Sequence, residues 1–146
     1  MSTYSRFTLL AAVAVLSLAP SLARAEGVEW LRSAEQAAEL AQRTGRPILI
    51  YVRSENCMYC DKMQKDVWQD PATANIIMHE FIPLKLTREE NKEAVEAMKV
   101  KGYPSTLVFS PERTYISRID GYVNSHKLLD EISGIRTASA ERNMNR

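Results

Sequence analysis

The two cysteines of this chain constrain its fold and chemistry more than any other feature. Cys57 and Cys60 are its only cysteines, and they follow the apolar run at 48–52 at the start of a helix-like stretch. A helix N-terminus stabilises a thiolate through its free N–H groups and its dipole. Lowering a thiol pKa from about 8.5 to about 7 raises the thiolate fraction at pH 7 from roughly 3% to 50%. The spacing therefore predicts a dithiol that cycles between reduced and oxidised states.

Two other uses of the cysteine pair are open. A structural disulfide here closes a ring of only four residues, for which loop entropy gives about 2 kcal/mol, against nearly 5 kcal/mol for a long loop. A zinc site needs four ligands, and no second cysteine pair or His-x3-5-His motif follows. We favour redox chemistry over both uses, and expect no metal site and no cofactor beyond the Cys57–Cys60 disulfide.

Residues 1–25 have the pattern of a secretory signal peptide. Arg6 precedes an apolar segment at 7–18, and the Ala-x-Ala end at 23–25 places the cleavage site after Ala25. The apolar segment is shorter than the roughly 20 residues that a membrane-spanning helix needs. The pattern predicts export, and the bacterial periplasm is the favoured compartment because disulfides form there.

The mature chain is long enough for one domain and too short for two. Removing residues 1–25 takes away two arginines and leaves 17 basic and 18 acidic side chains, without a lysine- or arginine-rich block. Nucleic-acid binding therefore has no support in the composition. We expect a single domain at 26–136, and a polar tail at 137–146 that lacks periodicity and frays.

Hydrophobic periodicity predicts alternating helices and strands. Their order indicates an α/β protein with three layers, α/β/α, around a central mixed sheet that ends in a β-hairpin. The predicted helices cover 29–43, 57–68, 71–78 after the cap Asp70, 88–99, and about 125–132 with Gly134 ending the last one; the predicted strands cover 47–53, 81–86, 106–109 and 115–119.

The chain resembles the thioredoxin-like superfamily over nearly the whole mature chain. The stretches that carry the likeness are Arg-Pro-Ile-Leu at 46–49, the cysteine pair, Asp-Pro at 70–71 and Gly-Tyr-Pro-Ser-Thr at 102–106. The chain looks most like exported members, including the C-terminal periplasmic domain of the thiol:disulfide interchange protein DsbD. The resemblance implies a thioredoxin fold and an exported thiol–disulfide oxidoreductase of protein substrates. Reduction is slightly favoured over oxidation, with a membrane or periplasmic redox partner that recharges the dithiol, and we expect a monomer.

The resemblance also implies roles for individual residues. Cys57 is the nucleophile and Cys60 the resolving thiol. Pro104 is implied to be a cis proline beside the cysteines, and the preceding Tyr103 offers backbone groups to an extended substrate segment. Met58 and Tyr59 lie between the cysteines, so they would contact the substrate at the rim of the reactive sulfur. For Tyr59, covering the start of the helix is an equal alternative.

Two positions depart from the thioredoxin pattern. Asn56 stands where thioredoxins usually have tryptophan, and Tyr51 stands where they have a buried acid that assists proton transfer at the resolving thiol. This chain therefore needs another group or water for that step. Glu55 and Asp61 are nearby candidates for that step, although an exposed charge is the favoured interpretation of both. Glu55 and Lys85 are also candidates to tune the thiol pKa values, Lys85 because it matches a thioredoxin strand lysine, although a surface lysine is its favoured interpretation.

Two other functions stay open on the sequence. The soft sulfurs of Met58 and Met63 could join the cysteines in holding Cu(I), although core packing is the favoured use of Met63. A non-catalytic thioredoxin-like module that docks partners near Pro104 is the other alternative. The intact cysteine pair argues against it.

Overall fold

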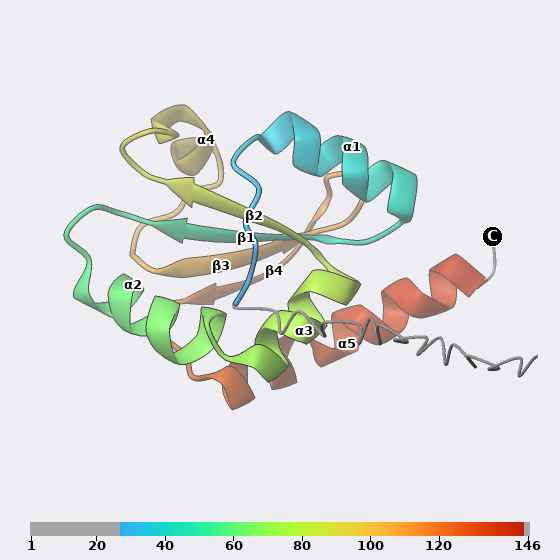
Figure 1. Cartoon of the computed structure of the whole chain (residues 1–146). Coiled ribbons are helices and arrows are strands. Elements are labelled where there is room, and N and C mark those ends of the chain that lie inside the picture. Colours follow the sequence, from blue (N-terminus) through green and yellow to red (C-terminus); the bar gives the residue numbers. More distant parts are fainter. Residues whose placement is uncertain (1–26, 145–146) are drawn as a thin grey trace, which may run out of the picture.

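The structure of the chain is a computed structural model that describes residues 27–144, so the predicted signal peptide lies outside the described residues. Four strands form one sheet with helices on both faces (Figure 1). Across the described residues no helix is long and apolar enough to cross a membrane. The elements in chain order are α1 (Ala34–Thr44), β1 (Ile48–Arg53), α2 (Met58–Met63), a π-helical turn (Gln64–Trp68), α3 (Pro71–Glu80), β2 (Ile82–Thr87), α4 (Lys92–Ala97), β3 (Ser105–Phe109), β4 (Tyr115–Asp120) and α5 (Ser125–Met144).

The sheet has the order β2-β1-β3-β4 and is mixed, as predicted. Strand β1 pairs in parallel with β2 and antiparallel with β3, and β3 forms the predicted hairpin with β4. All four strands lie within one residue of their predicted bounds at each end. Because β1 lies inside the sheet with helices over both faces, nearly all of its side chains are buried.

Alternate residues of β1 enter two separate cores. Leu49 and Tyr51 belong to a cluster that packs under α2, α3 and α5, while Ile50 and Val52 belong to a cluster under α1 and α4. This division follows from the period of two along a strand, which sends neighbouring side chains to opposite faces. The three layers that the sequence predicts are therefore present, with one core on each side of the sheet.

The first helix begins later than predicted. Instead of starting at residue 29, α1 starts at Ala34, where the Ser33 hydroxyl accepts the Gln36 N–H at 3.2 Å. The preceding segment runs along β2, with the Leu31 N–H donating to the Pro83 carbonyl at 3.0 Å. This segment has helical spacing but pairs with β2 instead, because the edge of β2 supplies hydrogen-bond partners for the backbone N–H and carbonyl of Leu31. The helix ends at Thr44, one residue beyond its predicted end, and Gly45 caps it in the left-handed conformation with φ of 68°.

Two later helices also differ from their predicted bounds. Helix α4 starts at Lys92 rather than at residue 88, because the Asn91 side chain accepts the Thr87 N–H and holds residues 88–91 as a turn. Helix α5 continues past Gly134 to residue 144, so the predicted end at that glycine is wrong. A glycine inside a helix costs only about 1 kcal/mol, and no proline follows to stop the helix. The fraying of the tail stays a prediction.

Asp70 is expected to stabilise α3 through its carboxylate. Its Oδ2 accepts the Thr73 N–H at 2.8 Å and the Thr73 hydroxyl at 2.6 Å. The Thr73 side-chain and backbone hydrogen bonds lower the pKa of Asp70. Asp70→Ala should lower the free energy of unfolding by about 1–2 kcal/mol at pH 7. Since the folded-state pKa is depressed, this contribution is complete above the unfolded pKa of about 3.9 and is lost as the pH falls through the lowered value.

Urea unfolding of wild type and Asp70→Ala between pH 7 and pH 3 measures this difference. Glu131→Ala is the matched control, because Glu131 is an exposed acid on α5, and it should change the free energy of unfolding by less than about 0.5 kcal/mol. A stability difference for Asp70→Ala that does not shrink toward pH 3 would contradict the role of the carboxylate.

Candidate active site

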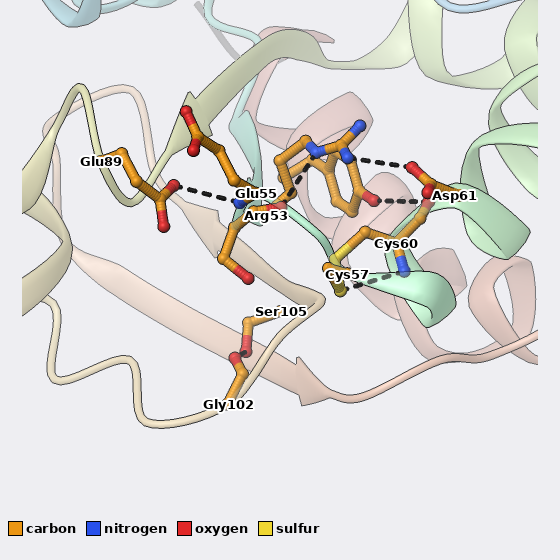
Figure 2. The surroundings of a disulfide bond; sticks show 10 residues. Arg53, Glu55, Cys57, Cys60, Asp61, Glu89, Gly102 and Ser105 are labelled. Carbon is orange, nitrogen blue, oxygen red and sulfur yellow. Dashed lines mark hydrogen bonds and ion pairs between the residues drawn. A yellow bond between two sulfur atoms is a disulfide. The ribbon is translucent and has the colours of Figure 1, made fainter.

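Cys57 and Cys60 form a disulfide at the carboxyl end of β1, where the chain turns into α2 (Figure 2). Cys57 is half-buried, whereas Cys60 is fully buried beneath it. Only the first cysteine is therefore placed to meet another molecule. The roles expected for the two residues, an attacking thiol and a resolving thiol, stay a prediction.

The backbone around Cys57 directs an N–H group at its sulfur. Cys57 is the N-cap of α2, with extended φ and ψ of −104° and 97°, and its Sγ accepts the Cys60 N–H at 3.2 Å. The preceding Asn56 has a positive φ of 49°, a conformation that asparagine adopts more readily than most residues. A hydrogen bond of this kind favours the charged form of an acid, so it would stabilise a thiolate once the disulfide is reduced.

The loop with Pro104 lies beside the cysteines because of the sheet register. Ser105 at the start of β3 is paired with Val52 near the end of β1. The Tyr103–Pro104 peptide bond is cis, as the family resemblance implies. The Ser105 hydroxyl donates to the Gly102 carbonyl oxygen at 2.8 Å. Figure 2 shows these two residues on the loop beside the cysteine pair. Pro104 is buried and Tyr103 is half-buried, so this loop is held against the end of β1.

An apolar surface borders Cys57 on the side of α2. Met58 and Tyr59 are 73% and 55% exposed, which is unusual for such large apolar side chains. The Tyr59 ring lies 6.5 Å from the ring of Tyr122, whose hydroxyl donates to Asp66 at 3.0 Å. Tyr122 was missed in the sequence because it lies beyond β4, and only the packing of the fold brings it to α2. The exposure of Met58 and Tyr59 fits contact with another protein.

A family model described as thioredoxin-like matches residues 29–111, which is more than half of the chain. The chain belongs to the thioredoxin-like family. Its structure is similar to that of a thioredoxin from Thermus thermophilus, with a TM-score of 0.67 and 24% identity over 75% of this chain and 87% of the other. It is also similar to DsbH oxidoreductase, with a TM-score of 0.64 and 16% identity over 94% and 95% of the two chains. These likenesses support the thioredoxin fold.

A curated relative of the chain is much longer. The chain is 25% identical over 93 residues to the uncharacterized protein B0495.5 of Caenorhabditis elegans, which covers 58% of this chain and 13% of that protein. The chain thus spans about one eighth of the length of this relative. The family model shows that this domain is thioredoxin-like. The likeness to the DsbD domain stays a prediction.

The thioredoxin-like chain has a neutral hydroxyl where thioredoxins have a buried acid. Tyr51 is fully buried, and its hydroxyl donates to the Cys60 carbonyl at 3.1 Å. Burial raises the pKa of Tyr51 to about 12, so its hydroxyl stays protonated at neutral pH. Its ring packs against both Trp30 and Trp68, with ring centroids 5.5 and 5.1 Å away, and the two tryptophan rings also contact each other. Tyr51 can therefore position the resolving cysteine, but it cannot accept its proton at neutral pH.

Lys85 is half-buried rather than a free surface lysine. It is paired with Tyr51 across β1 and β2, and its Nζ donates to the Gln64 side-chain oxygen at 3.1 Å. Burial is the main cause that lowers the pKa of Lys85, and the nearby charges of Arg32 and Arg53 add to it. Its hydrogen-bond partner among the described residues is thus a neutral amide and not a cysteine. A role in tuning the thiols stays a prediction.

Glu55 has an exposed side chain, as its favoured interpretation expects. Its backbone N–H donates to the Glu89 carboxylate at 3.1 Å, while Arg53 and Asp61 form an ion pair at 2.9 Å on the other side of the loop (Figure 2). The contact with Glu89 was missed in the sequence because the two residues are 34 positions apart. These contacts tie the cysteine loop to β1, to α2 and to the turn after β2.

The two methionines of the copper alternative lie in different environments. Met58 is exposed beside Cys57, whereas Met63 is fully buried in the core under α2. Core packing, the favoured use of Met63, accounts for its position. Within the described residues no group of three or more histidine, cysteine or acidic side chains could hold a metal ion.

Tyr51→Phe tests the link between Tyr51 and the resolving cysteine. The variant keeps the aromatic packing and removes one buried hydrogen bond, so the free energy of unfolding of the oxidised protein should fall by about 1 kcal/mol. Denaturant unfolding measures the change. Tyr115→Phe is the control, because Tyr115 is 54% exposed and loses no hydrogen bond to a described residue. Equal stability of Tyr51→Phe and wild type would show that the hydroxyl contributes nothing to this contact.

Proposed function

We propose that this protein is a thiol–disulfide oxidoreductase that acts on protein substrates through Cys57 and Cys60. The observation that carries the proposal is the arrangement of the pair, with Cys57 half-buried at a helix N-cap and Cys60 buried behind it. The cis-proline loop and the exposed Met58 lie at the same site and support a protein substrate. Family membership supports the same chemistry.

The reaction transfers two electrons from the dithiol to a substrate disulfide. The Cys57 thiolate attacks one substrate sulfur, a mixed disulfide forms, and the other substrate sulfur leaves as a thiolate that takes up a proton. The Cys60 thiol then loses its proton and its sulfur attacks Cys57 Sγ. The mixed disulfide breaks, the Cys57–Cys60 disulfide forms, and the second substrate thiol is released. Reduction of the pair by a redox partner completes the cycle.

We propose that the protein works as a reductant in the periplasm. The signal-peptide pattern at 1–25 supports this location, and the resemblance to a reducing DsbD domain that the sequence predicts supports this direction. A bacterial periplasm offers no reducing buffer, so a membrane or periplasmic redox partner must supply the electrons. The mass of the protein recovered from a periplasmic fraction tests export, because cleavage after Ala25 removes residues 1–25.

The two cysteines should fail in different ways when they are replaced by serine. Cys57→Ser should abolish disulfide reduction, and Cys60→Ser should accumulate mixed disulfides with substrate, because the first attack proceeds without the second. Insulin reduction and non-reducing gel electrophoresis measure the two outcomes. Each variant is the control for the other, since both lack the intramolecular disulfide. A purely structural disulfide predicts the same behaviour in both variants, and normal turnover in either would contradict the assignment.

The redox potential of the pair tests the direction of electron flow. A reductant should have a potential near that of thioredoxin, about −270 mV, whereas a strong oxidant lies near −120 mV. Equilibration of the mature protein with glutathione or dithiothreitol buffers of known ratio measures the value, and Cys60→Ser is the control that cannot form the intramolecular disulfide. A value near −120 mV would reverse the proposed direction and leave the exchange chemistry in place.

A further inference from the structure

A pocket lies beside the cis-proline loop, outside the cysteine pair itself. Its volume is about 380 Å³, and its lining comes from the turn after β2, from α4 and from the segment between α4 and β3. In Figure 1 these segments lie at the end of the sheet where α2 begins. Three cationic side chains and three apolar or aromatic ones line it together with Glu96: Arg88, Lys92, Lys101, Val95, Val100 and Tyr103.

The backbone connects this pocket to the site of exchange. Tyr103 directly precedes the cis proline, so its side chain lines the pocket while its backbone belongs to the loop beside the cysteines. On the opposite side, the Arg88 N–H donates to the Arg53 carbonyl at 2.8 Å, four positions before Cys57. A polypeptide that lies along Tyr103 to reach Cys57 would therefore contact a residue that also lines the pocket.

The charge of the lining is positive and largely uncompensated. Lys92 and Lys101 are exposed, and neither forms an ion pair or hydrogen bond through its side chain with residues 27–135. Arg88 lies 4.0 Å from the Glu89 carboxylate, but that carboxylate also accepts the Glu55 N–H and so faces the cysteine loop. Glu96 is the one acid in the lining, against three cations.

The pocket also has an apolar base. Val95 is buried, and Val100 and Tyr103 are half-buried. A side chain with an apolar stem and a negative tip matches this arrangement, because its methylene groups would meet the valines while the carboxylate meets the lysines at the rim. Aspartate and glutamate are the protein side chains with these properties.

We infer that this pocket binds an acidic side chain next to the target cysteine of the substrate, so that the protein selects acidic disulfide segments. This inference rests on the proposed function and names its substrate class. Lys92 and Lys101 are the specificity-determining residues, and the cysteines carry out the exchange for any substrate. Because both lysines are exposed, the preference should be modest and should weaken with salt.

Two peptides that differ only in charge test the inference. Each carries one cysteine linked as a mixed disulfide to a chromophoric thiol, flanked by aspartate and glutamate in one peptide and by asparagine and glutamine in the other. The mature, reduced wild-type protein should react with the acidic peptide about three to ten times faster at low salt. The ratio should approach one at about 0.5 M salt, where charges are screened within a few ångströms.

Charge-altering variants assign the preference to the pocket. Lys92→Gln/Lys101→Gln should bring the ratio of rates close to one, and Lys92→Glu/Lys101→Glu should favour the neutral peptide. Both should reduce the uncharged hydroxyethyl disulfide as fast as wild type. Lys127→Glu is the control, because Lys127 is an exposed lysine on α5, in the layer across the sheet from α4. It should keep the preference of wild type.

The outcomes separate this inference from the proposed function. If wild type reduces both peptides at equal rates, or if Lys127→Glu loses the preference as fully as the pocket variants, selection by the pocket is overturned and the exchange chemistry stands. If reduced wild type reacts with neither peptide nor hydroxyethyl disulfide, the proposed function itself is overturned.

Discussion

The pairing of β1 with a strand on each side is the interaction on which the rest of the structure depends. Its register with β3 sets Ser105 opposite Val52, and this brings the Pro104 loop to the end of the strand that leads into Cys57. The same strand divides its side chains between two cores. A slip of one residue would exchange the two faces of β1, so the burial of both cores holds the reactive site in position.

Tyr51 shows how one substitution changes the support of a shared site. A buried acid in this position could exchange protons with the resolving thiol. The tyrosine instead donates a hydrogen bond to the Cys60 carbonyl, and its pKa of about 12 keeps it neutral. Lys85, paired with Tyr51 across β1 and β2, donates to the side-chain oxygen of Gln64. Cys60 is positioned by a neutral aromatic cluster, and its proton must leave through water or another group.

Two surfaces flank the loop region of the site and come from elements that are distant in the sequence. Met58 and Tyr59 provide an exposed apolar area on α2 beside Cys57, whereas Lys92 and Lys101 provide positive charge in the pocket that Tyr103 also lines. The cysteines define a chemistry that is indifferent to the rest of the substrate. On the proposed function, selectivity would therefore come from apolar contact and charge on these two surfaces.

The sequence by itself determined the fold class, all four strands to within one residue, the cap at Asp70 and the reactive pair, because each depends on patterns of a few neighbouring residues. The tertiary structure decided the late start of α1, the contact of Glu55 with Glu89 and the pocket beside Tyr103. These features join segments that are far apart in the chain. Periodicity and capping carry no information on such contacts, because strand pairing and core burial select them only once the whole chain is folded.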